Sequence, residues 1–504
     1  MQTLRDAIDA HAAARPGAAC VLAPEPDATL TYRDIARAGR ALGAYLAASR
    51  IAPGSVVSFM LPNGIAAANL FLGTMYAGYV VSPVNLHAQD SQLAYTLEHS
   101  GTRLVFAAPE FVDRLEKLKP AGREIMLQPT DPDRLGLPEL SGAPLAEVTA
   151  ATAAMLMYTS GTTGVPKGVL LCHGNMLHAG KVVSSWQALG EDDRVLSSLP
   201  LYHINGQCIA TVAPVVSGGS IVMPHRFSAR EWWPLVERYR PTWLNLVPTI
   251  VAYLLHGADP ADAEACRRVR FARCASAPLP PEQHRAFEGR FGISVMEAMG
   301  LTETASIAFA NPLEPERRKY GSPGLPLGVE ARVVAPDGMV LEDGAVGEIE
   351  LRGPSVMAGY YREPERTAQV LKDGWLATGD LGRRDADGFY FITGRLKELI
   401  IKGGENIAPR EIDEALMRHP AVLEAAAVGI PDPDYGQDIL ACVVLKPGAY
   451  CEEEDLRAHC LVHLGRYKTP RLLRVVDALP KGPSGKVQRL RLPELIAAAS
   501  KAHE

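Results

Sequence analysis

The sequence predicts an α/β protein with a large N-terminal domain and a small α+β domain at its C-terminus. Up to about residue 390, strand-like runs such as Val56–Leu61 alternate with helical patterns such as Asp34–Ala48, which is typical of sheets covered by helices. Short strands broken by Asp-Gly turns interrupt this alternation over Pro323–Glu365 and predict a β-rich unit. After residue 395 the order of elements changes, which indicates a separate compact domain.

The elements of the N-terminal part follow one another in order. Strands are expected over Val56–Leu61, Arg103–Ala107, Ala153–Met157, Arg194–Leu199 and Ser220–Met223, and helices over Asp34–Ala48 and Arg230–Tyr239. The longest apolar stretch, Ala66–Val81, contains Asn69 and two glycines and is shorter than a membrane-spanning helix. A buried helix followed by a strand is therefore expected there.

The C-terminal domain is expected to begin with a strand that follows a polar junction. Strands are expected over Glu398–Ile401, Val422–Val428 and Ile439–Leu445, and helices over Pro409–His419 and Glu452–Leu464, before a basic tail. Pro409 suits the first turn of a helix, where its missing N–H costs nothing. The junction Thr393–Glu398 is the expected hinge.

Composition excludes several classes of protein. The net charge of −6 and the absence of a basic block argue against a nucleic-acid binder. The eight cysteines form no CxxC pair, so they predict reduced thiols rather than a zinc or redox site. The N-terminus carries acidic residues and lacks the apolar core of a signal peptide. We expect a cytoplasmic protein without integral membrane contact.

The strongest chemical signal is the segment Tyr158–Gly168. It combines four serine or threonine hydroxyls, three glycines and a lysine after the apolar strand Ala153–Met157. Glycines let backbone N–H groups approach phosphate oxygens, hydroxyls donate further bonds, and lysine supplies charge. The segment is not a Walker A loop. Composition alone allows a surface loop equally well.

The string YTSGTTGVPKGV resembles the phosphate-loop signature of the acyl-adenylate-forming superfamily, which includes acyl- and aryl-CoA synthetases, nonribosomal-peptide adenylation domains and luciferases. Further strings agree in chain order: PLYH from Pro200, ASAPL from Ala275, EAMGLTET from Glu297, WLATGD from Trp375, GRLKE from Gly394, GGENI from Gly403 and PKGPSGK from Pro480. The resemblance implies two α/β subdomains plus the β-rich unit over residues 1–395, and a mobile domain over residues 396–504.

The resemblance also implies roles for individual residues. It assigns catalytic roles to Lys486, His203, Glu303 and Lys397, and a Mg²⁺ ion to Glu303 and Thr159. It assigns ATP or CoA binding to Thr159, Ser160, Gly161, Thr162, Thr163, Gly164, Lys167, Ala275, Ser276, Ala277, Glu297, Ala298, Met299, Gly300, Leu301, Thr302, Asp380, Ile392, Arg395, Gly403, Gly404 and Glu405.

The chemistry of three side chains agrees with these roles. Asp380 can accept both ribose hydroxyls, Arg395 can reach ribose or phosphate oxygens, and Glu303 is a hard oxygen ligand for Mg²⁺. Taken singly, each has an ordinary alternative: a turn aspartate, a surface ion pair and an exposed helix glutamate. Met299 departs from the family pattern, which often has tyrosine there, and Ala275 stands where the family usually has glycine.

The resemblance implies an ATP-dependent acyl-CoA synthetase. A carboxylic acid and ATP give acyl-AMP and pyrophosphate, and coenzyme A then takes the acyl group and releases AMP. The C-terminal domain would rotate about Lys397, removing Lys486 and opening a pantetheine channel past Gly403 and Gly404. Two alternatives remain: an adenylation enzyme that loads a carrier protein, and a nucleotide-binding regulator without catalysis. The intact Lys486 and Glu303 argue against the regulator.

The identity of the acid is less determined. The acyl pocket is expected near Ser185–Trp186, His203–Gln207, Val247–Thr249, Arg273–Pro278 and Met299–Thr304. Among members, the closest resemblance is to crotonobetaine- or carnitine-CoA ligases and fatty-acyl-CoA ligases, so a small or medium acid is expected. Asn205, Gln207 and Arg273 either recognise a polar group of the acid or lie behind the pocket. Whether the chain forms a homodimer stays open.

Overall fold

The computed structural model describes residues 1–138, 145–159, 166–260, 263–481 and 487–501. The chain forms two compact units. The first comprises Met1–Leu279, Gln283–Ala331 and Leu351–Leu376, and the second comprises Pro280–Glu282, Arg332–Glu350 and Ala377–Glu504. The two units are defined by compactness and not by mobility, so the boundary of a mobile domain at residue 395 stays a prediction.

The first unit contains two large sheets. The nine-stranded sheet has the order β15 (Leu325–Pro326), β14 (Phe309–Ala310), β13 (Val295–Met299), β12 (Phe271–Cys274), β11 (Trp243–Leu246), β9 (Arg194–Leu196), β10 (Ser220–Val222), β1 (Ala19–Ala23) and β2 (Ala28–Thr31). Its strands run parallel from β13 to β1. Parallel strands place their carboxyl ends at one edge, where α/β proteins bind ligands.

The seven-stranded sheet carries the phosphate-loop segment. Its order is β18 (Gly359–Tyr360), β8 (Lys167–Cys172), β7 (Ala153–Thr159), β4 (Val80–Pro83), β3 (Val56–Met60), β5 (Leu104–Ala107) and β6 (Met126–Pro129). Strands β7 to β6 in this order are parallel, whereas β8 and β18 are antiparallel to their neighbours. Because β7 and β8 form a hairpin, Thr159 and Lys167 stand opposite each other at the same end of the two strands.

Helices and helical turns connect these strands. They are α1 (Leu4–Ala14), α2 (Tyr32–Ala48), α3 (Ile65–Ala77), α4 (Asp90–Ser100), α5 (Pro109–Leu118), α6 (His173–Trp186), η1 (Asn205–Val212), α7 (Ala213–Ser217), α8 (Ala229–Tyr239), α9 (Pro248–His256), α10 (Ala263–Arg267), α11 (Pro281–Phe291), η2 (Thr302–Thr304), η3 (Pro315–Arg317) and α12 (Pro364–Val370).

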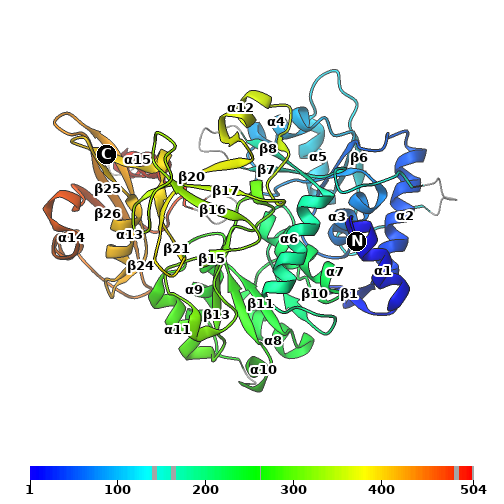
Figure 1. The fold of residues 1–504 in the computed structure, drawn as a ribbon, viewed down its shortest axis with the longest axis horizontal. Coiled ribbons are helices and arrows are strands. Elements are labelled where there is room, and N and C mark those ends of the chain that lie inside the picture. Colours follow the sequence, from blue (N-terminus) through cyan, green and yellow to red (C-terminus); the bar gives the residue numbers. More distant parts are fainter. Residues whose placement is uncertain (139–144, 160–165, 261–262, 482–486, 502–504) are drawn as a thin grey trace. The chain divides into compact units, whose positions relative to one another are not determined.

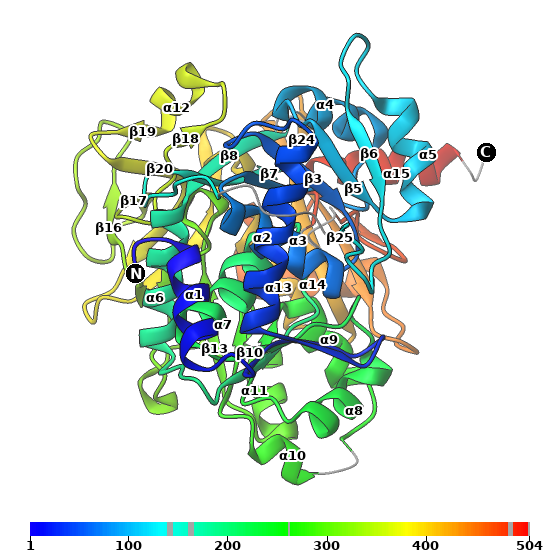
Figure 2. The same ribbon diagram turned by 90° about the vertical axis from the view of Figure 1, so that its right-hand side faces the viewer.

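Helix α3 is buried on every side, as its apolar sequence requires. It lies against α2 in both views (Figures 1 and 2). Gly39 allows this approach, because a Cβ there would lie 2.5 Å from Cδ1 of Tyr76. The buried helix and strand expected over Ala66–Val81 are thus confirmed as α3 and β4. Among the described residues, no helix is long and apolar enough to cross a membrane.

The second unit contains most of the β-rich strands and the C-terminal elements. These are β16 (Glu330–Val334), β17 (Gly347–Arg352), β20 (Trp375–Arg384), β21 (Tyr390–Arg395), η4 (Leu396–Glu398), β22 (Ile400–Lys402), β23 (Glu405–Ile407), α13 (Pro409–Met417), β24 (Val422–Asp432), β25 (Gly436–Leu445), α14 (Glu453–Lys468), β26 (Leu472–Val475), η5 (Arg489–Arg491) and α15 (Leu492–Lys501). Strand β19 (Leu371–Lys372) belongs to the first unit and forms a hairpin with Trp375 and Leu376.

The predicted fold class is confirmed, with local differences. The strand expected over Arg194–Leu199 ends at Leu196, because the chain turns towards Pro200. The expected basic tail was wrong in part: β26 joins the sheet beside β25, and α15 follows. Their apolar residues, including Leu473 and Leu492, are buried in the core of this unit. All eight cysteines are free thiols, as expected.

Candidate active site

The hairpin of β7 and β8 positions the two ends of the predicted phosphate loop. Thr159 and Lys167 face each other across it. Ser160, Gly161, Thr162, Thr163 and Gly164 lie outside the described residues. Strand β18 pairs with the outer edge of β8 and places Tyr360 opposite Val169. The ammonium of Lys167 lies 4.9 Å from the centre of the Tyr360 ring, a distance at which cation and ring attract each other.

Tyr360 also connects this hairpin to Glu303. Its hydroxyl donates a hydrogen bond of 2.9 Å to Oε1 of Glu303, and the N–H of Met357 donates one of 2.7 Å to the Glu303 carbonyl. Burial and the Glu303 carboxylate raise the pKa of Tyr360, so the phenol remains a donor at neutral pH. The first unit therefore brings Lys167 and Glu303, predicted from separate strings, into contact with one tyrosine: Lys167 with its ring and Glu303 with its hydroxyl.

The base of the phosphate hairpin packs against α4. Nδ1 of His99 lies 2.8 Å from the hydroxyl of Tyr158, and the Tyr361 ring meets His99 edge-on. Burial lowers the pKa of His99, so its imidazole is neutral at pH 7. This contact supports β7 one residue before Thr159.

The predicted adenine motif follows β13. Glu297 is buried, and its Oε1 accepts a hydrogen bond of 3.2 Å from the N–H of Leu279. Ala298 and Met299 pair with β14. At Gly300 a Cβ would lie 2.1 Å from the carbonyl oxygen of Ser306, so only glycine fits the turn that leads into Glu303. The turn continues through Leu301 and Thr302.

A chain of hydrogen bonds joins the elements that surround the predicted acyl pocket. Nδ2 of Asn245 on β11 donates to Oδ1 of Asn205 at 3.2 Å, and Nδ2 of Asn205 donates to Oγ of Ser276 at 3.1 Å. Ser276 has φ of +76° in the loop after β12, between Ala275 and Ala277. Asn205 begins η1, a π-helix, and such turns are frequent at functional sites.

The segment before η1 is anchored on both sides. Nδ2 of Asn63 donates a hydrogen bond to the carbonyl of Leu199, and its Oδ1 accepts one from the N–H of Leu201, each at 3.0 Å. From the other side, Nε2 of Gln207 donates to the carbonyl of Leu201 at 2.5 Å. His203 follows this anchored turn, and its ring meets Tyr202 at 4.9 Å. The structure thus brings His203 and Asn205 to the same short segment, whereas the amide of Gln207 contacts its own turn.

Arg273 is a fully buried cation in this region. Its side chain is 0% exposed, and none of its three guanidinium nitrogens has a hydrogen-bond partner among the described residues. Burial lowers its pKa to about 9. The register of the sheet pairs Arg273 with Asn245 on one side and Met296 on the other.

In the second unit, Asp380 and Arg395 form an ion pair. They face each other across β20 and β21, and Nε of Arg395 lies 2.6 Å from Oδ1 of Asp380. Asp380 is 2% exposed, and its Oδ2 has no partner among the described residues. The N–H of Asp380 bonds the hydroxyl of Thr378 at 3.1 Å. The pair agrees with the predicted ribose site, since one carboxylate oxygen is left for a hydroxyl donor.

Gly403 and Gly404 form the turn of the β22–β23 hairpin. Their φ values are +53° and +84°, and Lys402 pairs with Glu405 across the turn. A two-residue turn with both φ values positive is the type I′ turn that glycine favours. At Gly403 a Cβ would lie 3.1 Å from the Tyr467 hydroxyl, whereas Gly404 faces open space. The geometry of this turn therefore accounts for both glycines by itself, independently of the predicted pantetheine channel.

The predicted hinge lies in a short helical turn of the second unit. Lys397 is exposed within η4. Before this turn, the carbonyl of Ile392 accepts a hydrogen bond of 2.7 Å from Nη1 of Arg410. Lys486 lies outside the described residues. The segment that contains it is flanked by Lys481 and Val487, which form a β-bridge. The roles of all these residues stay predictions.

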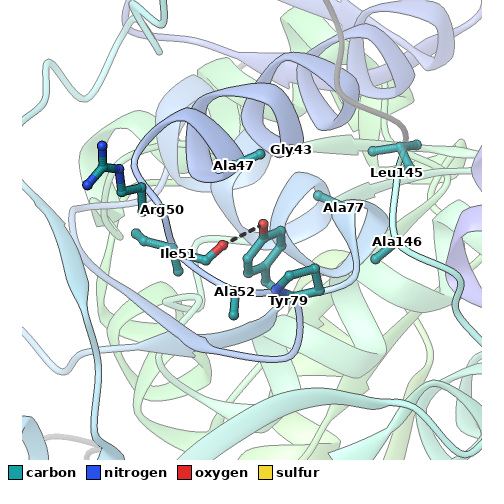
Figure 3. Close-up of a pocket in the computed structure, with 10 residues that line it drawn as sticks. Gly43, Ala47, Arg50, Ile51, Ala52, Ala77, Tyr79, Leu145 and Ala146 are labelled. Atoms are coloured by element: carbon teal, nitrogen blue, oxygen red, sulfur yellow. Dashed lines mark hydrogen bonds between the residues drawn. The ribbon is translucent and has the colours of Figure 1, made fainter.

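One pocket lies away from every predicted site residue. It has a volume of about 350 Å³ and is lined by Gly43, Ala47, Arg50, Ile51, Ala52, Pro53, Ala77, Tyr79, Leu145 and Ala146. Figure 3 shows the Tyr79 hydroxyl bonded to the carbonyl of Ile51 at 3.0 Å. Its lining is mainly small and apolar, and no cluster of charged side chains converges on it.

Sequence reasoning missed Tyr360, His99 and Asn245. Asn245 was detectable, because it is the polar residue in the apolar strand Trp243–Leu246. No local pattern connects Tyr360 with Glu303 or His99 with Tyr158, because these contacts form only when distant segments pack together.

Comparisons with known proteins identify the class. The AMP-binding enzyme family matches residues 8–361, and the AMP-binding enzyme C-terminal domain matches residues 411–486. The chain belongs to this family of adenylate-forming enzymes. It is an ATP-dependent, AMP-forming acid–CoA ligase that acts on a small-molecule carboxylic acid. ATP and coenzyme A are therefore its other substrates, and the carrier-protein alternative is not favoured.

Individual relatives are more specific. The chain is 54% identical over 500 residues to sulfoacetate–CoA ligase of Cupriavidus necator, covering 97% of each chain. It is 34% identical over 470 residues to oxalate–CoA ligase of Arabidopsis thaliana, covering 89% of this chain and 90% of the relative. The crystal structure of ATP-bound MatB from Rhodopseudomonas palustris superposes with a TM-score of 0.89 at 30% identity, covering 98% of this chain and 99% of that one.

Proposed function

We propose that this acid–CoA ligase activates a short acid that carries a second anionic group, with sulfoacetate as the first candidate. The observation that carries the proposal is the 54% identity, over 97% of both chains, to a relative named for sulfoacetate. A second relative is named for oxalate. Both acids are short and carry two negative charges at neutral pH. The proposal narrows the range of candidate substrates, because the sequence alone predicts only a small or medium acid.

The first half-reaction joins the acid to AMP. A carboxylate is a poor acyl donor, because the oxide ion that would have to depart is a very poor leaving group. One carboxylate oxygen attacks the α-phosphorus of ATP, the bond to the β-phosphate oxygen breaks, and pyrophosphate leaves. We assign Lys486 and Lys167 to the neutralisation of negative charge in this step, and Asp380 with Arg395 to the ribose. Positioning and charge neutralisation supply most of the catalysis in such transfers.

Glu303 and Thr159 would hold Mg²⁺ bound with ATP. Mg²⁺ prefers one or two protein oxygen ligands together with phosphate oxygens, and it would neutralise charge on the triphosphate. The carboxylate of Glu303 fits this role, because it is only partly buried and is oriented by the Tyr360 hydroxyl at 2.9 Å. Thr159 stands opposite Lys167 at the end of β7, where the predicted phosphate loop begins.

The second half-reaction transfers the acyl group to coenzyme A. The CoA thiol loses its proton, its thiolate sulfur attacks the acyl carbon, the bond to the AMP oxygen breaks, and AMP leaves as the thioester forms. We assign Lys397 to the rotation that separates the two half-reactions, and Gly403 and Gly404 to the pantetheine channel. The open space beside Gly404 supports this assignment. A small domain that rotates between two positions is a known type of transition in enzymes.

The test is a panel of acids assayed for pyrophosphate release and CoA consumption. Sulfoacetate, oxalate and malonate represent short dianions, whereas propionate, butyrate and a long-chain fatty acid represent monoanions. We expect CoA-dependent turnover, with the highest kcat/KM among the dianions. A preference for a monoanion would contradict the proposed substrate class. Cytosolic location and a homodimer are further predictions, which cell fractionation and light scattering would test.

A further inference from the structure

Arg273 lies in the carboxyl-terminal half of β12, within the parallel part of the nine-stranded sheet. Residues that pair directly across parallel strands present their side chains to the same face. Arg273 therefore shares a face with Asn245 and Met296, while Ala272 and Cys274 pack into the core on the other face. On its own face, Phe271 stacks on Trp243 with ring centres 5.7 Å apart. A cation and an amide thus stand among apolar residues.

Within the described part of the chain, the guanidinium of Arg273 has no hydrogen-bond partner, in contrast to other arginines of this unit. Arg194 donates to the carbonyl of Tyr239 at 2.7 Å and to the Ser220 hydroxyl at 3.0 Å. Arg318 donates to the carbonyls of Pro312 at 2.9 Å and Val295 at 2.8 Å. For Arg273, Nε, Nη1 and Nη2 are all buried and have no partner in the described part of the chain.

An unpaired buried cation is costly, so the fold retains it against a free-energy penalty. Burial lowers the pKa of Arg273 to about 9, which leaves the guanidinium charged at pH 7. Removing a charge from water without giving it a partner carries a large free-energy cost. An arginine with only a structural role would use protein carbonyls, as Arg318 does. An anion from outside the chain is a partner that such a guanidinium can bind.

The surroundings of Arg273 place that anion beside the acyl side of the active site. Asn245, its neighbour across the strands, starts the hydrogen-bonded series Asn245, Asn205 and Ser276. Ser276 follows Arg273 by three residues, in the loop that the sequence predicts beside the acyl pocket. The short turn that contains His203 leads directly into Asn205. Polar side chains from β11, η1 and the loop after β12 are therefore hydrogen-bonded to one another beside the strand that carries the buried cation.

We propose that Arg273 binds the second, non-reacting anionic group of the acid, whether a sulfonate or a carboxylate. The inference rests on the proposed function, and it names the residue that selects the substrate class. A guanidinium presents two parallel N–H donors that match two oxygens of either group. An acid of the same length without the second anionic group leaves the cation unpaired, and a site with an unpaired polar group rejects such an analogue strongly.

Substitution of Arg273 by methionine tests the inference, because methionine keeps much of the length and removes the charge. For Arg273→Met we expect kcat/KM for sulfoacetate and malonate to fall about 10- to 100-fold, chiefly through KM. We expect kcat/KM for propionate to stay unchanged or to rise. Arg273→Lys keeps the charge without the fork and should retain part of the dianion activity. The ratio of sulfoacetate to malonate activity in the wild type shows which anionic group is preferred.

Arg270→Met is the matched control. Arg270 immediately precedes β12 and already has partners, since its Nη2 lies 2.8 Å from Oδ1 of Asp193. Its loss should lower activity on dianions and monoanions by the same small factor. A second measurement is independent of turnover: sulfoacetate without ATP should raise the melting temperature of the wild type and of Arg270→Met, but not of Arg273→Met.

The outcomes separate the inference from the proposed function. If the wild type turns over dianions and Arg273→Met slows dianions and propionate equally, the inference is overturned while the proposed function stands. If sulfoacetate raises the melting temperature of Arg273→Met as much as that of the wild type, the inference is likewise overturned. A wild type that turns over only monoanions would overturn both. An Arg273→Met variant that fails to fold would mark Arg273 as structural and overturn the inference.

Discussion

The hydroxyl of Tyr360 donates a hydrogen bond of 2.9 Å to Oε1 of Glu303, although the two residues are 57 positions apart. The same ring lies 4.9 Å from the ammonium of Lys167. Tyr360 therefore contacts both a proposed metal ligand and the charged residue of the phosphate-loop string. This relationship gives the first prediction a structural basis that the sequence lacks.

Tyr360→Phe should weaken the enzyme's use of Mg²⁺ with ATP. The substitution removes the bond that orients the Glu303 carboxylate, which is worth about 0.5–1.5 kcal/mol or roughly 2- to 12-fold. The measurement is pyrophosphate release as a function of Mg²⁺ concentration. Tyr361→Phe is the control, because Tyr361 meets the ring of His99 instead. Identical Mg²⁺ curves for Tyr360→Phe and the wild type would contradict the orienting role.

Asp380→Ala should raise the KM for ATP more than the KM for the acid. Asp380 is buried beside Arg395, and its Oδ2, which has no partner among the described residues, is the atom that we propose accepts a ribose hydroxyl. Loss of a charge-assisted bond costs about 1.5–3 kcal/mol. Steady-state kinetics with each substrate varied in turn would measure the effect. Asp343→Ala, at an exposed ion pair with Arg384, is the control. A raised KM for the acid alone would contradict the ribose assignment and indicate that Asp380 acts in the acid-binding site.

Lys397→Pro should separate the two half-reactions. Proline fixes φ near −65° and restricts the rotation of residues 398–504 that we propose. We expect single-turnover formation of acyl-AMP to survive and CoA-dependent product formation to collapse. Lys397→Ala removes the same exposed side chain without restricting the backbone, so it should retain both steps. Equal slowing of both steps by proline would remove support for the alternating domain.

Lys486→Ala should impair adenylation and spare thioester formation. Removal of one preorganised charge typically lowers a rate by about 10²–10³. The variant would be supplied either with ATP, acid and CoA or with a synthetic acyl-adenylate and CoA. Slow turnover only from ATP would support the assignment. Equal slowing from both starting points would indicate a structural role or an action on CoA.

Lys481→Ala is the control for this experiment. Lys481 belongs to the same string, and its ammonium lies 2.7 Å from Oε1 of Glu424. It should therefore affect stability slightly and neither half-reaction. Full activity of Lys486→Ala from ATP would instead mean that Lys486 is an ordinary solvated lysine.

Elements with a strong local pattern were predictable from the sequence. The apolar run of β7, the all-apolar helix α3 and the proline that begins α13 each predict an element without any distant contact. The ends of elements were less predictable, as at β9, because local hydrogen bonds to the following turn decide them. The C-terminal strand β26 was missed, since its pattern depends on pairing with β25.

The sequence by itself determined the α/β fold class, the order of the chemical strings and the class of reaction, because these depend on residues that are neighbours in the chain. Only the tertiary structure decided that Asp380 pairs with Arg395, that Tyr360 bonds Glu303, and that Arg273 is buried with no hydrogen-bond partner among the described residues. The physical reason is that burial and pairing depend on which distant segments pack together. The sequence gives the same residue type whether its charge is solvated, paired with a carboxylate or buried, and these environments differ greatly in free energy.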